Sequence, residues 1–215
     1  LVEDIKPHIG AVKLGLEYFT ANGAVGVHHL AHSELPVFLD LKFHDIPNTV
    51  ARAIKATAGI NTFMMTVHTG GGRDMLRAAI DASMEVAAMT GKDRPLIVGV
   101  TVLTSLDQDD LSIIGMRDRL PDQVMRLADL AQSSGLDGVV CSPYEIQMLR
   151  RHCGSDFRLV VPGIRPAGSR HDDQKRVLTP PQAVAAGADY LVIGRPITEA
   201  ESPATMAAGI FASLS

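Results

Sequence analysis

The chain has 215 residues, of which 46% are hydrophobic and 20% are charged, and its formal net charge is −4. This composition suits a soluble α/β protein with a sizeable core, and an isoelectric point near 6.0 gives no basic field to attract nucleic acid or an anionic membrane. Aromatic residues make up 4% and Trp is absent, which argues against base-stacking platforms. With no apolar run near the roughly 20 residues of a membrane span, we expect a cytoplasmic protein without nucleic-acid or membrane partners.

The chain alternates between short apolar segments and longer segments with helical periodicity. It opens on what resembles the tail of an amphipathic helix, and helical patterns follow at 47–59, 73–89 and 121–135, with Gly135 as a C-cap. The apolar segments are predicted as strands at 11–15, 37–42, 63–68, 96–103, 137–142, 157–163 and 189–194.

Strands that are apolar throughout and separated by helices predict a parallel sheet with both faces covered. Seven βα repeats are visible, and one strand ahead of the opening helix would complete the eight of a TIM barrel. We therefore expect a single α/β TIM-barrel domain over 1–215 whose first strand precedes residue 1. An open doubly wound sheet is the alternative, although no G-x-G-x-x-G turn follows an early strand.

Charged residues interrupt the second predicted strand in the stretch "PVFLDLKFHDIPNT" (36–49). Alternation places Asp40 and Lys42 on one face, at the strand end where barrel enzymes build their sites. Lys13 occupies the equivalent position on the preceding strand. An ion-pair network that only fills the barrel top is as plausible as a functional row, although buried ion pairs seldom improve stability over apolar residues.

Two glycine–arginine turns follow the last two strands, "VVPGIRPAG" and "LVIGRP". Gly163 and Gly194 allow backbone N–H groups to approach an anion, and Arg165 and Arg195 supply guanidinium groups. Gln174, in the polar loop "SRHDDQKR", could add a neutral donor. Because barrels often bind phosphate in these two loops, the pattern predicts a phosphorylated small molecule with its reactive end near Lys42.

These residues carry a family resemblance. "DLKFHDIPNT" resembles the D-x-K-x-x-D-I-x-x-T signature of orotidine 5′-phosphate decarboxylases. "VTVLTS", "LDGVVCS", "VPGIRPAGS", "DQKR" and "LTPPQAVAAGADYLVIGRPIT" are similar to the bacterial branch, in the right order and over nearly the whole chain.

The resemblance implies decarboxylation of orotidine 5′-monophosphate to uridine 5′-monophosphate, with no metal and no organic cofactor. It implies that Lys42 donates a proton to C6, that Asp40 lies beside the substrate carboxylate, and that Lys13 contacts the ribose. The family also places an Asp for the ribose at the end of its first strand.

The resemblance further implies a homodimer with shared active sites. Asp45 and Thr49 would reach the neighbouring subunit's site, and Ile46 between them is carried over as a substrate-binding position. Thr104 matches the position that contacts the pyrimidine. The phosphate-side positions are Arg165, Gln174, Gly194 and Arg195.

Two alternatives remain. A related barrel decarboxylase of a sugar phosphate shares a D-x-K-x-x-D pattern but uses magnesium, and "DIPNT" with the terminal G-R-P argues against it. A catalytically silent nucleotide-binding barrel is the other, disfavoured because simple anion binding gains nothing from the two carboxylates of Asp40 and Asp45.

Overall fold

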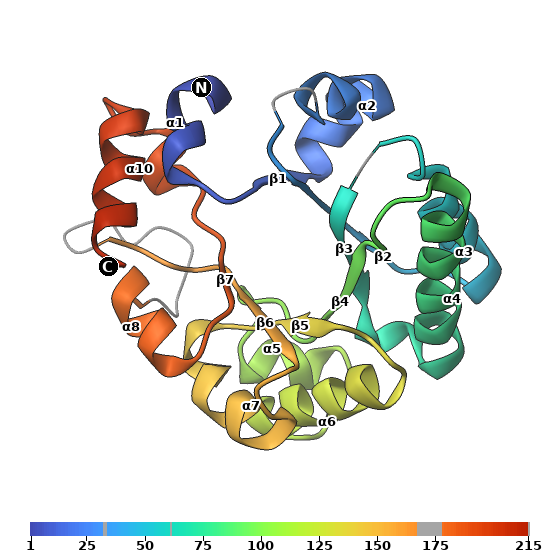
Figure 1. The fold of residues 1–215 in the computed structure, drawn as a ribbon. Helices are drawn as coiled ribbons and strands as arrows, with labels where there is room; N and C mark the ends of the chain where they lie inside the picture. The colour runs from blue at the N-terminus through green and yellow to red at the C-terminus, as the bar shows by residue number, and fades with distance from the viewer. Residues whose placement is uncertain (32–33, 61, 167–177, 215) are drawn as a thin grey trace.

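The computed structural model describes residues 1–31, 34–60, 62–166 and 178–214. Its centre is a curled parallel sheet surrounded by helices (Figure 1). Within the described residues the sheet has seven strands in the order β1-β2-β3-β4-β5-β6-β7. The strands are β1 (Val12–Gly15), β2 (Val37–Phe43), β3 (Thr62–His68), β4 (Leu96–Val100), β5 (Gly138–Val140), β6 (Arg158–Val161) and β7 (Tyr190–Leu191).

Helices follow most strands and lie on the outside of the curled sheet (Figure 1). Several begin with proline in the first turn, where the missing N–H costs no helical bond. The α-helices are α1 (Val2–Ile5), α2 (Leu16–Ala31), α3 (Pro47–Ala56), α4 (Arg73–Thr90), α5 (Gln108–Ile113), α6 (Leu120–Ser133), α7 (Ile146–Cys153), α8 (Pro180–Ala186), α9 (Arg195–Thr198) and α10 (Pro203–Ala212). Short 3₁₀ turns are η1 (Lys6–His8), η2 (Thr69–Gly71) and η3 (Pro143–Glu145). No helix of the described chain is long and apolar enough to cross a membrane.

The strands bury both faces, as their apolar composition predicted. Leu39 and Met65 belong to the core between sheet and helices, and Leu41 packs against that core. Residues of the opposite parity form a separate inner cluster, Phe38, Met64, Val98 and Val160. The alternation therefore turns Asp40 and Lys42 to the interior of the curled sheet, with Phe38 below them on the same strand face.

The strand order confirms the barrel-type α/β fold and excludes the doubly wound alternative. Each strand pairs with its successor in sequence, whereas a doubly wound sheet reverses its strand order partway across. In the described residues β1 and β7 form the two edges, and α1 packs beside α10 between them through Ile5 and Ile210 (Figure 1). The expected strand before residue 1 lies outside the described residues and stays a prediction.

The expected strand ends need a small correction. The fourth strand was expected to reach 103 and the last to reach 194, but β4 ends at Val100 and β7 at Leu191. Val102 and Val192 lie beyond these ends and line the cavity at the mouth of the sheet. The sequence therefore stays apolar beyond the strand ends because these residues line the cavity, not because the strands continue.

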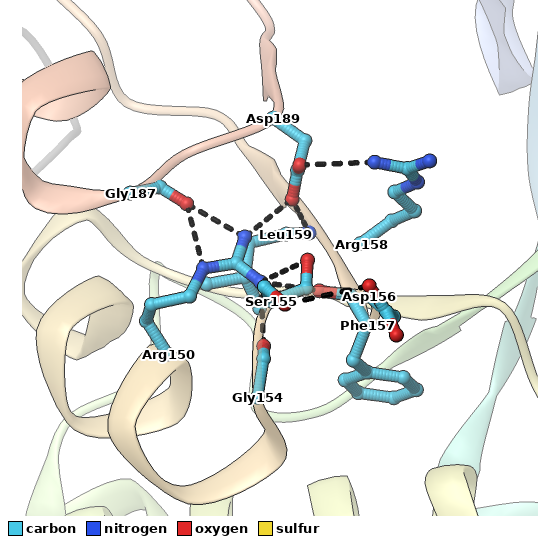
Figure 2. Close-up of polar contacts among 9 residues, drawn as sticks. All are labelled: Arg150, Gly154, Ser155, Asp156, Phe157, Arg158, Leu159, Gly187 and Asp189. Carbon is cyan, nitrogen blue, oxygen red and sulfur yellow. Dashed lines mark hydrogen bonds and ion pairs between the residues drawn. The ribbon is translucent and has the colours of Figure 1, made fainter.

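A polar network joins the amino-terminal ends of β6 and β7 (Figure 2). The Arg150 guanidinium donates to the Asp189 carboxylate at 2.5 Å and to the carbonyl oxygens of Gly187, Gly154, Ser155 and Phe157. Asp189 also accepts the Leu159 amide at 2.8 Å.

A similar arginine–aspartate network joins the amino-terminal ends of β4 and β5. Arg94 donates to Asp137, which accepts the Ile97 amide at 2.7 Å. Networks at the amino-terminal strand ends of a barrel serve stability, since barrel enzymes place their chemistry at the opposite, carboxyl ends of the strands.

Candidate functional site

Two lysines flank one aspartate at the carboxyl ends of β1 and β2. Lys13 Nζ lies 3.0 Å from Asp40 Oδ2, and Lys42 Nζ lies 2.9 Å from Asp40 Oδ1. The side chain of Asp40 is 11% exposed, against 33% for Lys13 and 30% for Lys42. The expected row of Lys13, Asp40 and Lys42 is thus brought together, with the carboxylate buried and both ammonium groups partly open to solvent.

The two lysines keep Asp40 ionised. Burial raises the pKa of this carboxyl, but the Lys13 and Lys42 charges and their hydrogen bonds together outweigh burial, so the pKa lies below its ordinary value. At neutral pH the row therefore carries alternating charges, plus, minus, plus.

Lys42 stands on a strained and irregular part of β2. Leu39 pairs with Met65 and Phe43 pairs with Val67, so β2 uses four residue steps where β3 uses two. Lys42 has φ +52, in the left-handed region, which costs a non-glycine residue about 1–3 kcal/mol. Such strain is concentrated at functional sites, where the surrounding structure holds it for a purpose.

The hydroxyl of Thr66, on β3, lies against this irregular segment. Thr66 Oγ1 donates to Asp40 Oδ1 at 3.0 Å and accepts the Lys42 amide at 2.8 Å. Thr66 was not among the predicted site residues, although the alternation of the predicted strand 63–68 places it on the interior face.

Two histidines extend the cluster. The rings of His44 and His68 lie 5.3 Å apart, and burial, then the His44 and Lys42 charges, lower the pKa of His68 against the opposing effect of Asp40. His68 is therefore mainly neutral at neutral pH. Neither His44 nor His68 was among the site residues predicted from the sequence.

A cavity of about 210 Å³ opens at the charged row. Its lining combines Lys13, Asp40 and Lys42 with Thr104 and with apolar side chains, which are Phe38, Val100, Val102, Leu103, Val140, Val160, Pro162 and Val192. Charges beside an apolar wall act in a medium of lower effective dielectric than water, so their influence on a bound group is strengthened.

A larger hollow of about 700 Å³ lies on the outside, between α8 and α10. Its lining is mainly Pro, Ala, Ser, Thr and Met, and Glu201 brings the one charge among its lining residues. An anionic ligand gains nothing there, so the smaller cavity at the mouth is the candidate site.

The predicted phosphate-side residues lie just beyond the adjacent strands β6 and β7. Those strands pair through Val160 and Tyr190, so the two loops leave the sheet side by side. Arg165 is 7% exposed, and its Nη1 donates to the Ile164 carbonyl at 3.0 Å. Gly194 is exposed at the start of α9, and Arg195 is half-buried in its first turn. Gln174 lies outside the described residues.

Asp45, Ile46 and Thr49 lie at the start of α3 and are exposed. Asp45 Oδ1 accepts the Ile46 amide at 2.7 Å, and Ile46 is 66% exposed. A single exposed apolar side chain is common on protein surfaces and does not by itself mark an interface. The expected contribution of these residues to a partner's site stays a prediction.

No group of three or more His, Cys, Asp or Glu side chains in the described part of the chain is placed to hold a metal ion. The two cysteines, Cys141 and Cys153, are buried free thiols whose pKa values are raised, mainly by burial. The expectation of a site without metal or organic cofactor stays a prediction.

These features define a barrel-type α/β protein with a charged candidate active site at the carboxyl ends of its parallel strands. The sequence matches the family model described as "Orotidine 5'-phosphate decarboxylase / HUMPS family" over residues 1–210. The chain belongs to this family.

Individual relatives are similar in sequence or structure over the whole of this chain. The chain is 53% identical over 214 residues to the orotidine 5′-phosphate decarboxylase of Paramagnetospirillum magneticum, covering 100% of this chain and 91% of that protein. It is 52% identical to that of Actinobacillus succinogenes, covering 100% of this chain and 90% of that protein. The crystal structure of the orotidine 5′-phosphate decarboxylase of Lactobacillus acidophilus is similar at a TM-score of 0.86 and 36% identity, covering 100% of this chain and 93% of that one.

Proposed function

We propose that this protein decarboxylates orotidine 5′-monophosphate to uridine 5′-monophosphate and carbon dioxide, a step of pyrimidine nucleotide synthesis. The observation that carries the proposal is the Lys13–Asp40–Lys42 row around one cavity, in a chain of the orotidine 5′-phosphate decarboxylase family. In the reaction the bond from C6 to the carboxylate breaks, its electron pair stays on C6, and a proton replaces the departing carbon dioxide.

Lys42 stabilises the carbanion and supplies the proton. The C6 electron pair has no adjacent carbonyl to delocalise it, so stabilisation has to be electrostatic and immediate. The Lys42 ammonium is held by Asp40 at 2.9 Å and by a fixed backbone conformation, so little reorganisation is needed when charge develops. Proton transfer from this ammonium to C6 then completes the product.

Asp40 makes a smaller contribution by facing the substrate carboxylate. Two unit charges about 4 Å apart interact by roughly 4 kcal/mol at an effective dielectric near 20. Relief of that repulsion corresponds to about three powers of ten in rate, and ground-state destabilisation is a contested source of catalysis. The main function of Asp40 is therefore to fix Lys13 and Lys42, with Lys13 contacting the ribose.

The remote phosphate provides binding energy that organises the reacting end. Arg165, Gln174, Gly194 and Arg195 bind the dianion, while Thr104, in the cavity lining, contacts the pyrimidine. Charge-assisted bonds from guanidinium groups are strong, and energy from a part of the substrate that does not react can lower the barrier at the part that does.

The active unit is a homodimer of single-domain subunits. The dimer is supported by the family resemblance and by the exposure of Asp45, Ile46 and Thr49 beside the mouth. The single domain is supported by one continuous sheet and by a core that runs from Leu14 to Ala183. In the dimer Asp45, Ile46 and Thr49 complete the site that holds Lys42 of the other subunit.

Subunit mixing tests the shared site. Lys42→Ala and Asp45→Ala homodimers should each be nearly inactive, whereas a mixed dimer has one site with both defects and one with neither. Random exchange makes about half of the dimers mixed, so activity should recover to about a quarter of the wild-type value. Differently tagged chains pulled down together verify exchange, and a mixture that stays inactive despite exchange would place Asp45 in its own subunit's site.

The reaction itself is tested by following the loss of orotidine 5′-monophosphate absorbance in the presence of a metal chelator. Turnover in chelator supports the proposal. Turnover that requires added magnesium would favour a sugar-phosphate type of decarboxylase, and binding of uridine 5′-monophosphate without any turnover would show a silent nucleotide-binding barrel.

A further inference from the structure

Thr66 is buried in the middle of β3, with its side chain on the interior face. Met64 on the same strand face belongs to the inner cluster, while Met65 and Val67 belong to the core under the helices. Thr66 is 0% exposed, so its hydroxyl has lost contact with water and depends on partners inside the protein.

Both partners of that hydroxyl come from the charged row. Thr66 Oγ1 donates to Asp40 Oδ1 at 3.0 Å, the carboxylate oxygen that also accepts Lys42 Nζ at 2.9 Å. The same hydroxyl accepts the backbone N–H of Lys42 at 2.8 Å. One side chain therefore fixes the carboxylate that orients the Lys42 ammonium and the backbone that carries it.

The backbone bond compensates for the irregular pairing of β2. Between Leu39 and Phe43 the ladder with β3 is interrupted by two extra residues, and Lys42 takes φ +52. An amide freed from a ladder at a bulge needs another acceptor. Thr66 Oγ1 is that acceptor, which ties the strained residue to the neighbouring strand.

A threonine is also a good β-former, and its presence could reflect packing alone. Valine has the same shape and higher strand preference, and it would fill the site without a polar atom to satisfy. Packing therefore accounts for the methyl group of Thr66 but not for its hydroxyl.

We infer that Thr66 is a positioning residue for the decarboxylation, holding Asp40 and Lys42 in their reactive arrangement through its hydroxyl. The inference rests on the proposed function, because it assigns Thr66 a purpose in that reaction. Thr66 itself lies behind the row and acts only through Asp40 and Lys42.

The test compares Thr66→Val, which keeps the shape and removes the hydroxyl, with Thr66→Ser, which keeps the hydroxyl. Displacing the proton donor by a fraction of an ångström should lower kcat by about 10-fold to 100-fold in Thr66→Val, with KM changed by less than about threefold. Thr66→Ser should stay within about threefold of wild-type kcat.

Thr57→Val is the matched control. Thr57 is 5% exposed and its hydroxyl donates to the Ile54 carbonyl at 2.7 Å, so this variant also loses a buried hydroxyl and its hydrogen bond. It should keep kcat and KM. A loss of kcat in Thr57→Val equal to that in Thr66→Val would show a general effect on folding and overturn the inference, as would wild-type kcat in Thr66→Val.

Amide hydrogen exchange at Lys42, measured by NMR, separates this inference from the proposed function. Exchange should accelerate by at least about tenfold in Thr66→Val and stay unchanged in Thr57→Val; unchanged exchange in Thr66→Val refutes the inference. A wild-type protein that does not turn over orotidine 5′-monophosphate refutes the proposed function instead. If neither Thr66→Val nor Thr66→Ala folds while Thr57→Val does, the hydroxyl serves the fold and the positioning role is wrong.

Discussion

Replacing Asp189 with alanine should destabilise the protein without slowing its reaction. The carboxylate accepts the Leu159 amide at 2.8 Å and the Arg150 guanidinium at 2.5 Å, and it is 20% exposed (Figure 2). Its loss leaves the N–H of the fully buried Leu159 without its acceptor and removes a charge-assisted bond. Each effect costs about 1–3 kcal/mol, and because they overlap we expect a total near 3 kcal/mol.

Differential scanning calorimetry measures the consequence. For a protein of this size 1 kcal/mol corresponds to about 2–4 °C, so Tm should fall by about 6–12 °C. At 25 °C kcat/KM should stay within about twofold of wild type, because the network joins the amino-terminal strand ends and the chemistry lies at the carboxyl ends.

Asp156→Ala is the control for this experiment. Asp156 lies in the loop beside the network (Figure 2), is exposed, and accepts a long hydrogen bond from the Ser155 hydroxyl at 3.4 Å. Its Tm should change by less than about 2 °C. Equal Tm values for the two variants, or a folded Asp189→Ala protein with strongly reduced kcat/KM, would refute the separation of stability and chemistry between the two ends.

Three further predictions concern the site. Lys42→Ala should abolish turnover but retain binding of uridine 5′-monophosphate in calorimetric titration; substantial residual kcat would contradict proton donation by Lys42. Arg195→Ala should lower kcat/KM by at least about 100-fold, with partial rescue of a phosphate-truncated substrate by phosphite, and an unchanged kcat/KM would exclude the phosphate role. Because the folded-state pKa of Asp40 is lowered, its stabilisation is fully present above about pH 4 and is lost as pH falls further, toward the folded value. The Tm difference between wild type and Asp40→Asn should therefore stay constant from about pH 7 to about pH 4 and shrink below about pH 4; a difference that already shrinks between about pH 7 and about pH 5 would contradict the ion-pair assignment.

Much of the fold could be predicted because its signals are local. Apolar runs separated by amphipathic helices indicate a covered parallel sheet wherever they occur. The two-residue period of a strand was enough to put Asp40 and Lys42 on one face and Leu39 and Leu41 on the other. Since parallel strands end together, the same reasoning brought Lys13 to the row before any contact between the strands was known.

What only the tertiary structure decided depends on register between segments far apart in the chain. Lys42 and Thr66 lie 24 residues apart in sequence, and their hydrogen bond depends on how β2 and β3 align. The two extra residues of β2 and the left-handed backbone of Lys42 depend on the same alignment. No pattern within either strand determines that alignment. The same holds for Arg150 and Asp189, which lie 39 residues apart in sequence and meet only because the sheet places β6 beside β7. Local sequence sets the direction in which a side chain points, but the partner it meets is set by the packing of the whole sheet.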